Sequence, residues 1–215
     1  MYIPAHFNES RLSELHAFIN KYPFGAVITG ASGHIEANHV PLILDPSSGP
    51  FGMLRGHIAR ANSLWRDVGS ETEVLVLFQG PSSYVSPSLY PSKKEHGKVV
   101  PTWNYGVVHA RGRLKWEHDP KWLRALVGQL TDQHEANQLE PWRVSDAPEE
   151  YVAKMLDAIV GLEISITELR GKLKLSQNRS ESDREGVRRG LGHGPDANAV
   201  AMAALMSGKS NKSVG

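Results

Sequence analysis

The chain has no cysteine among its 215 residues. Disulfides, cysteine-ligated zinc, iron–sulfur clusters and thiol nucleophiles are therefore excluded, because each of them requires a cysteine sulfur. A chain of this length buries about 70% of the surface that it exposes when unfolded, so it can fold without a disulfide or a metal. Any redox chemistry must then be supplied by a bound cofactor.

Long apolar runs are also missing. The first eleven residues do not combine a basic start with an apolar stretch, so we expect no secretory signal. No segment approaches the roughly 18 apolar residues that a membrane span requires. We therefore expect a cytoplasmic protein that has no membrane partner.

The spacing of the histidines argues against a metal site. Neither H-x-x-x-H nor H-E-x-x-H occurs among the ten histidines, and His34 and His39 would project from opposite faces of a strand. The P-loop, G-x-G-x-x-G and G-x-S-x-G patterns are absent too. We predict no metal, and no residue is assigned as catalytic.

Charge is nearly balanced overall but uneven along the chain. The net charge is +1, with 24 basic and 23 acidic residues. Between Arg170 and Arg189, seven basic residues face three acids, so this segment carries +4 and the rest is net negative. The segment is either a solvated helix face or an anion site. A general nucleic-acid surface would show a larger basic excess, so direct DNA binding is left open.

Hydrophobic periodicity predicts an α+β protein. Helices are expected over residues 8–20, with Asn8 as the N-cap, and over 59–68, 119–135, 148–159, 180–191 and 195–206. Strands are expected over 24–30, 34–44, 53–58, 73–79, 105–116 and 161–175, whereas 80–102 has no regular pattern. Because β and α segments do not alternate, we predict an antiparallel β-barrel with peripheral helices. Residues 1–206 are assigned to one domain and 207–215 to a flexible tail.

The first candidate site lies where a predicted strand meets a predicted helix. It contains Gly56, His57, Arg60 and Asn62. A helix N-terminus offers unpaired N–H groups and a positive dipole end, both of which favour an anion. Gly56 would permit close backbone approach, and His57 and Arg60 could reach phosphate oxygens. The alternative is that these are ordinary surface residues of a first helical turn.

Two further clusters combine aromatic and hydroxyl side chains. Residues 79–90 include Tyr84 and Ser86, which could wall a flat ligand or stiffen a turn. Trp103 and Tyr105 flank the amide of Asn104, next to polar Thr102, so these aromatic side chains are either core residues or ligand contacts. Neither cluster decides the function by itself.

The most specific cluster covers residues 171–179. Strand alternation would place Lys172, Lys174 and Ser176 on one face, followed by Gln177 and Arg179 before a helix. Two ammonium groups, a hydroxyl and a guanidinium in a row suit an anionic or heteroaromatic ligand. This cluster also lies within the basic segment of the chain.

Taken in order, these segments resemble the PaiB-type family of FMN-binding negative transcriptional regulators. The resemblance covers about residues 1–195 and implies a split β-barrel, related to pyridoxine-phosphate oxidase, that forms a homodimer with FMN at the subunit interface. The motifs that carry it are His39-Val-Pro-Leu42, Gly56-His-Ile-Ala-Arg-Ala-Asn62, Phe78-Gln-Gly-Pro81, Tyr84-Val-Ser-Pro87, Val100-Pro-Thr-Trp-Asn-Tyr105, Val108-His109, Gly171-Lys172 with Lys174, and Ser176-Gln-Asn-Arg179.

The resemblance also implies which residues bind the cofactor. The first cluster would lie near the phosphate and ribityl chain, and the C-terminal strand would approach from the other subunit. The aromatic and hydroxyl residues would make secondary contacts. The predicted FMN-binding residues are Gly56, His57, Arg60, Asn62, Tyr84, Ser86, Trp103, Lys172, Lys174, Ser176, Gln177 and Arg179.

The function implied is that of a negative transcriptional regulator or a flavin-dependent redox or sensor protein, with a small-molecule ligand or substrate. An enzyme of this kind would be an FMN-dependent oxidoreductase. No helix-turn-helix pattern is evident, and the arginines of residues 182–189 are diluted by Asp183, Glu185 and Gly186. The alternative is a haem-binding or haem-degrading protein on the same barrel, which the ten histidines keep open.

Overall fold

The computed structural model describes residues 1–31 and 34–208. None of the helices within these ranges is both long and apolar enough to cross a membrane. The helices are η1 (Ala5–Phe7), α1 (Leu12–Lys21), α2 (Leu64–Asp67), η2 (Pro87–Leu89), α3 (Ser92–His96), α4 (Pro120–Glu135), η3 (Val144–Asp146), α5 (Glu149–Asp157), α6 (Glu181–Gly192) and α7 (Ala197–Ser207). The strands are β1 (Asn8–Glu9), β2 (Phe24–Ala31), β3 (His34–Pro41), β4 (Ile43–Asp45), β5 (Met53–Ala59), β6 (Glu73–Val85), β7 (Thr102–Glu117) and β8 (Ile159–Lys174).

The strands form one sheet in the order β3-β2-β6-β7-β8-β5-β4, with β1 added to β8. Its registered pairs are antiparallel: β2 with β3 and β6, β5 with β4 and β8, and β1 with β8. β3 and β5 lie close together but are not neighbours in the hydrogen-bonded order. The sheet is therefore curved but open at this point, which confirms the predicted α+β class and split barrel.

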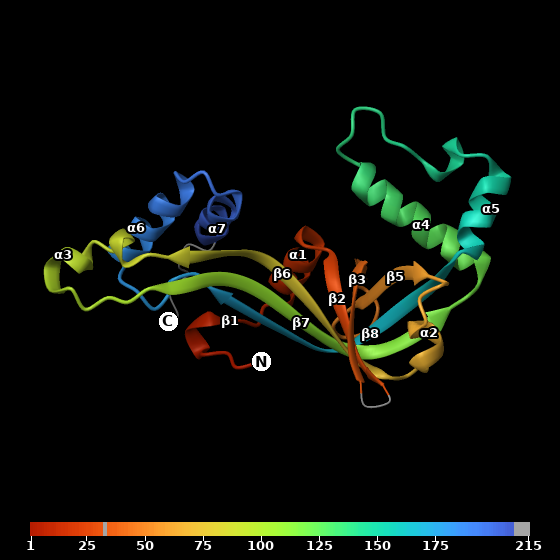
Figure 1. The fold of residues 1–215 in the computed structure, drawn as a ribbon, viewed down its shortest axis with the longest axis horizontal. Coiled ribbons are helices and arrows are strands. Elements are labelled where there is room, and N and C mark those ends of the chain that lie inside the picture. The colour runs from red at the N-terminus through yellow and green to blue at the C-terminus, as the bar shows by residue number, and fades with distance from the viewer. Residues whose placement is uncertain (32–33, 209–215) are drawn as a thin grey trace. The chain divides into compact units, whose positions relative to one another are not determined.

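The chain forms two compact units (Figure 1). Unit 1 comprises residues 1–15, 79–108 and 170–215, and unit 2 comprises residues 16–78 and 109–169. Three strands, β6, β7 and β8, contribute residues to both units. The assignment of residues 1–206 to one domain stays a prediction. Of the predicted tail, Ser207 ends α7, and residues 209–215 lie outside the described residues.

The core of unit 2 follows from strand alternation in β5. Leu54, Gly56 and Ile58 are buried, and the residues between them are partly exposed. A Cβ atom at Gly56 would lie 2.9 Å from the Pro41 carbonyl oxygen and 2.8 Å from a Leu42 methyl carbon. Glycine is therefore needed where β5 passes the end of β3, because only a missing side chain allows this approach.

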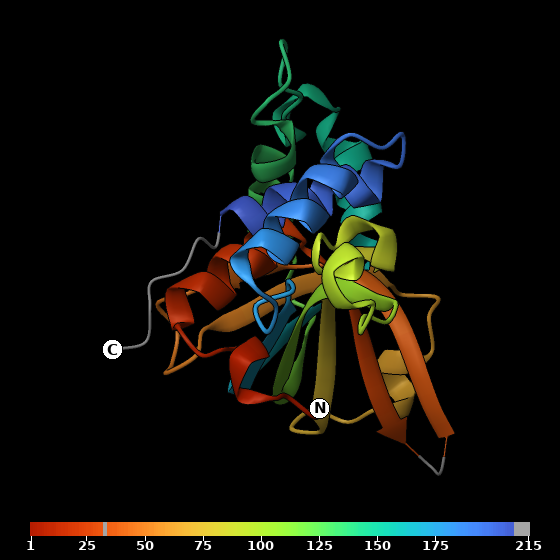
Figure 2. The same ribbon diagram turned by 90° about the vertical axis from the view of Figure 1, so that its left-hand side faces the viewer.

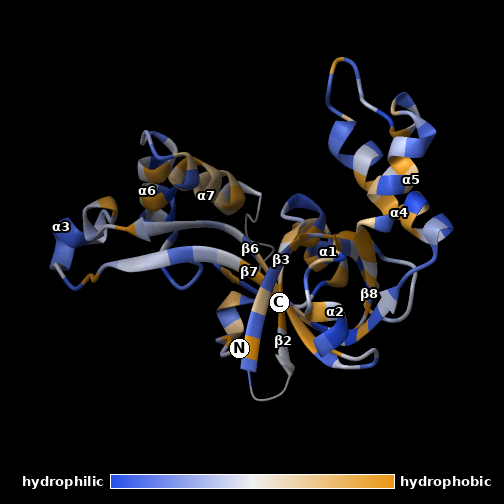
Figure 3. Ribbon diagram, turned by 45° about the vertical axis from the view of Figure 1, so that its right-hand side comes forward, coloured by the Kyte–Doolittle hydropathy of each residue, from blue (hydrophilic) through white to orange (hydrophobic). Residues whose placement is uncertain are grey.

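Helices α4 and α5 pack together in unit 2 through buried Leu123, Val152 and Leu156. Figure 3 shows apolar segments in both helices and hydrophilic segments beside them, as expected for amphipathic helices. Trp122 packs on β8 at Gly161, where a Cβ atom would lie 2.3 Å from the indole Cζ3. This glycine therefore allows α4 to lie against the strand.

Helices α6 and α7 lie side by side in unit 1 (Figure 2). Ser180 and Asp196 cap their N-termini by accepting hydrogen bonds from the backbone N–H groups of Asp183 and Asn198. The carboxylate of Asp183 in turn accepts hydrogen bonds from the backbone and hydroxyl of Ser92. This contact joins α6 to the start of α3.

Several of the predicted elements were wrong in extent. The strand predicted over 34–44 is divided into β3 and β4, which stand at opposite ends of the strand order. Residues 8 and 9 form β1, and Asn8 pairs with Lys172 in place of capping a helix, so α1 begins at Leu12. The helix predicted over 59–68 is reduced to α2. Residues 80–85 continue β6 because they alternate between buried and exposed positions, although their Gly, Pro and Ser residues suggested a loop. Of residues 31–33, which separate the first two predicted strands, 32 and 33 lie outside the described residues.

Two glycine substitutions, one in the contact between α4 and β8 and one elsewhere in α4, should have opposite effects on stability. Gly161→Ala would place a methyl group against Trp122, and we expect it to lower the free energy of unfolding by about 1–3 kcal/mol. Gly128→Ala, inside α4 with open space at its Cβ position, should raise it by about 0.5–1 kcal/mol. Urea unfolding followed by circular dichroism measures both. Equal stability of Gly161→Ala and the parent chain would contradict the close packing.

Candidate functional site

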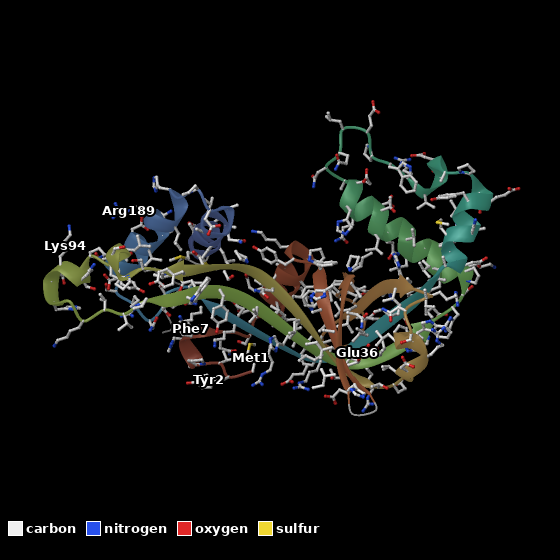
Figure 4. The ribbon with its side chains drawn as sticks, in the orientation of Figure 1. Met1, Tyr2, Phe7, Glu36, Lys94 and Arg189 are labelled. Atoms are coloured by element: carbon white, nitrogen blue, oxygen red, sulfur yellow. The ribbon has the colours of Figure 1, made fainter. Side chains whose placement is uncertain are left out.

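A basic and aromatic face is formed in unit 1 around Lys172 of β8. Its Nζ atom lies 5.8 Å from the Tyr2 ring centroid and 5.3 Å from that of Tyr105. It also donates a hydrogen bond of 3.2 Å to the Tyr2 carbonyl oxygen. Figure 4 labels Tyr2 and Phe7 in the N-terminal segment that contributes to this face. Aromatic faces and a carbonyl group therefore hold this ammonium group.

Lys174 extends the same face two residues further along β8. Its Nζ donates hydrogen bonds to the Thr102 hydroxyl and, at 2.5 Å, to the Trp103 carbonyl oxygen. The Phe7 ring centroid is 5.9 Å away. Burial lowers the pKa of Lys174, and the positive charges of Lys172 and Arg179 lower it further. No carboxylate is among these causes, so an anion bound here would relieve the repulsion.

Arg179 follows β8 and lies over a buried tyrosine. Its guanidinium carbon is 4.9 Å from the ring centroid of Tyr90. Burial raises the pKa of Tyr90, and the charge of Arg179 opposes that shift. Burial also acts to raise the pKa of Asp183, but hydrogen bonds from Ser92 and the charge of Arg179 bring it below its usual value. Arg179 is thus partly balanced by an acid, unlike Lys174.

Tyr84 of β6 and Trp103 of β7 form an exposed aromatic pair. Their ring centroids are 6.1 Å apart, with an interplanar angle of 70°, and the two residues are 50% and 55% exposed. Trp103 alternates along β7 with buried Asn104 and shares its face with Tyr105, over which Lys172 lies. The aromatic pair and the two lysines therefore occupy one face of the sheet in unit 1.

Ser176 does not share that face, so the predicted row of Lys172, Lys174 and Ser176 was wrong. β8 ends at Lys174, and Ser176 has a positive φ of 64°. Its buried hydroxyl is hydrogen-bonded to the amide of Asn104, 3.0 Å from Nδ2, on the opposite side of β7. The left-handed backbone turns the chain, which strand alternation alone does not indicate.

Gln177 and Ser86 form local hydrogen bonds in unit 1. The Gln177 amide donates to the Leu173 carbonyl at 2.5 Å and accepts from the Leu175 N–H at 2.6 Å. The Ser86 hydroxyl accepts from the Ser88 N–H at 3.2 Å and caps η2. Both side chains stabilise the backbone that borders the basic and aromatic face.

The first sequence cluster lies entirely in unit 2. Arg60 Nε donates to the Asp157 carbonyl at 2.6 Å, and its Nη2 donates to the Ile159 carbonyl at 2.8 Å. Asn62 donates to the Asn38 side chain at 2.7 Å and accepts from the Leu64 N–H at 2.9 Å. Since α2 begins only at Leu64, Arg60 and Asn62 lie in a turn before the helix and not in its first turn.

Gly56 and His57 complete this cluster. Gly56 serves the close passage of β5 and β3 described above. His57 is partly buried, and burial lowers the pKa of its imidazole. The structure therefore groups the predicted residues into two sets: these four in unit 2, and the other eight in unit 1.

Sequence reasoning missed several residues of the basic and aromatic face. Tyr105 was noted beside Trp103 at the start of the predicted strand 105–116 but was left out of the predicted FMN-binding residues. Tyr2 and Phe7 gave no signal, since they reach Lys172 and Lys174 only through the pairing of β1 with β8. Among the described residues, no group of three or more His, Asp or Glu side chains is placed to hold a metal ion.

Comparisons with known proteins identify the family. Residues 1–168 match the family described as "Putative FMN-binding domain". The protein "Protease synthase and sporulation protein PAI 2" of Bacillus subtilis is 32% identical over 214 residues, which cover 100% of both chains. An uncharacterized protein of Emericella nidulans is 36% identical over 222 residues, covering 87% of this chain and 88% of its own.

Two solved structures share the fold. The FAD and heme binding protein from Mycobacterium smegmatis has a TM-score of 0.56 at 16% identity, covering 77% of this chain and 71% of its own. The flavocytochrome Anf3 from Azotobacter vinelandii has a TM-score of 0.59 at 13% identity, covering 86% and 78%. At such identities the likeness shows the fold alone. The sequence matches confirm the PaiB-type resemblance: the chain belongs to this FMN-binding family, and FMN is its cofactor.

Proposed function

We propose that the chain binds FMN on the basic and aromatic face of unit 1, and that it does so as a homodimer. The observation that carries this proposal is the set of three cations, Lys172, Lys174 and Arg179, beside the exposed pair of Tyr84 and Trp103. The turn at residues 56–62 of the partner copy would complete the site, as the family resemblance implies. The protein would act in the cytoplasm without a membrane partner.

The chemistry of this face suits FMN. Burial lowers the pKa of Lys174 and the charges of Lys172 and Arg179 lower it further; a phosphate would offset this repulsion between cations. The half-exposed rings of Tyr84 and Trp103 offer apolar surface to a flat heterocycle. Charge and apolar surface therefore occur side by side, as a phosphorylated ring compound requires.

Other members of the predicted set would act by positioning. Ser176 and Gln177 fix the turn after β8, and Ser86 fixes the turn after β6. Arg60 and Asn62 hold the turn before α2 through hydrogen bonds within unit 2. Gly56 permits the packing of β5 on β3. Their contribution to FMN binding would be to keep the contacting groups in place.

Bound FMN would supply hydride or single-electron chemistry, and the chain would supply binding, orientation and electrostatics. Lys174 would place a positive charge next to the ligand, and an anionic ligand would in turn oppose the lowering of its pKa. The proposed role is that of a negative regulator or a flavin-dependent redox or sensor protein that responds to a small molecule. A gel-shift titration at rising salt would test direct DNA contact, since specific binding through phosphates weakens steeply with salt.

Removing the charge of Lys174 should weaken FMN binding. We expect Lys174→Met to raise the Kd for FMN by roughly 10-fold to 100-fold, because charge-assisted hydrogen bonds contribute about 1.5–3 kcal/mol. Titration of the apoprotein, followed by quenching of flavin fluorescence, measures this. Lys93→Met in α3 changes the net charge equally at an exposed site and should leave the Kd within about twofold.

Repeating the titration with riboflavin tests whether Lys174 recognises the phosphate group. Because riboflavin lacks that group, Lys174→Met should affect its binding much less than that of FMN. An equal loss for both ligands would contradict phosphate recognition by Lys174.

Sedimentation equilibrium of the FMN-loaded protein tests the homodimer, and a monomer that retains full affinity would exclude a site shared between copies.

Ser176 offers a test of the positioning role. Ser176→Ala leaves the buried Asn104 amide without its hydroxyl partner, so we expect the free energy of unfolding to fall by about 1–3 kcal/mol. Ser182→Ala, at an exposed site in α6, should change it by less than about 0.5 kcal/mol. Urea unfolding measures both. Weaker FMN binding by Ser176→Ala at unchanged stability would instead indicate direct contact with the ligand.

Haem binding is the second candidate function. The descriptions of the two fold neighbours name a heme-binding protein and a flavocytochrome, and this chain has ten histidines. Adding haemin to the purified protein separates the two candidates. A Soret band that is lost on replacing one histidine, together with failure to bind FMN, would favour haem. FMN binding without such a band would favour the flavin.

A further inference from the structure

We propose that unit 2 contains a second binding site, for a small uncharged ring compound that carries one hydrogen-bonding group. The site is a hollow of about 190 Å³ in which α4, α5 and β5 take part. It does not rest on the FMN proposal, because nine of its ten lining residues lie outside the set predicted to bind FMN, His57 being the exception. The lining residues are His57, Val127, Trp142, Val144, Ala147, Tyr151, Val152, Met155, Leu156 and Ile159.

The composition of the lining determines the class of ligand. Nine of the ten side chains are hydrophobic, with one polar atom each on Trp142 and Tyr151, and the tenth is His57. No lysine, arginine, aspartate or glutamate lines the hollow, so a phosphate or other strong ion would lose its hydration without a compensating charge. An uncharged, mostly apolar compound is the chemistry that fits.

Backbone packing places His57 at this hollow. His57 is paired with Gly161 in the antiparallel ladder between β5 and β8. Since Gly161 has no side chain, Trp122 packs on the strand there and brings α4 over the same region. Buried Leu123, Val152 and Leu156 join α4 to α5 and form part of the same apolar surroundings.

The imidazole of His57 is available to a ligand. Among the described residues, none forms a hydrogen bond or an ion pair with this ring. Burial lowers its pKa and so favours the uncharged ring, which offers one N–H donor and one nitrogen acceptor. A hydroxyl or ring N–H of a ligand would thus find a partner in an otherwise apolar site.

The size and the opening of the hollow suit a small ring. An apolar protein cavity of about 150 Å³ binds benzene, so a hollow of about 190 Å³ has room for a ring with a short substituent. Trp142, Tyr151 and Met155 are half-exposed, which leaves the hollow open to solvent at an apolar rim.

Binding of 4-methylphenol and of toluene to the full chain tests the site. The two compounds have similar size, but only 4-methylphenol can form a hydrogen bond with His57. We expect 4-methylphenol to bind roughly tenfold more tightly, as one hydrogen bond of about 1.4 kcal/mol would give. Calorimetry measures both affinities. The methyl signal of Met155 in methionine-labelled protein should shift on binding, and those of Met202 and Met206 in unit 1 should not.

Two pairs of variants locate the ligand. His57→Phe should remove the preference for 4-methylphenol and retain toluene binding, whereas His134→Phe, at an exposed site in α4, should keep the preference. Ala147→Phe should fill the hollow and abolish the binding of both compounds. Ala153→Phe, on the exposed face of α5 and outside the lining, should leave both affinities unchanged.

Several results would overturn this proposal. The proposal fails if neither compound shifts the Met155 signal, or if His57→Phe keeps the full preference for 4-methylphenol. It also fails if FMN displaces 4-methylphenol competitively, since the hollow would then belong to the flavin site. A Met155 signal that shifts with protein concentration alone would assign the hollow to a second copy of the chain. Lys174→Met should weaken FMN binding and leave the Met155 response to 4-methylphenol unchanged, because the two proposed sites are separate.

Discussion

The antiparallel ladder between β5 and β8 constrains the packing on both of its faces. It contains a glycine where the end of β3 comes close and another where α4 comes close. Gly56 lets β5 pass the end of β3 within a distance that any side chain would prevent. Gly161, one register step away on β8, lets Trp122 of α4 lie against the strand. Close approach of backbone and aromatic ring thus depends on two missing side chains. The position of His57 beside them follows from the same ladder.

Charge imposes the corresponding constraint in unit 1. Lys172 and Lys174 stand two residues apart on one strand face, and their ammonium groups contact aromatic rings, carbonyl oxygens and a hydroxyl in place of carboxylates. Such partners orient a cation without neutralising it, so the positive potential of the face persists. Arg179 differs because it interacts electrostatically with the carboxylate of Asp183, which partly compensates its positive charge. The face is therefore most anion-attracting at the two lysines.

Sequence patterns predicted the fold class and the strands whose residues alternate regularly, but they failed where a distant segment decided the local structure. Asn8 looked like a helix cap and instead pairs with Lys172, which is 164 positions further along the chain. Residues 80–85 contain turn-forming residues but are held as a strand by neighbouring strands of the sheet. Ser176 left its expected face because its backbone is left-handed. In each case tertiary contacts outweighed local propensity.

The same limits apply to the candidate site. The run from Gly171 to Arg179 was sufficient to predict that Lys172 and Lys174 share one strand face, since charge and alternation are both local properties. The sequence did not distinguish a histidine that meets phosphate from one that meets an apolar ring, because the two differ only in their surroundings. The hollow that His57 lines contains no lysine or arginine, and burial of His57 favours its neutral imidazole. The two proposals therefore assign the anionic ligand chiefly to the lysines of unit 1 and the neutral ligand to the hollow of unit 2, so that the two ligands need not compete.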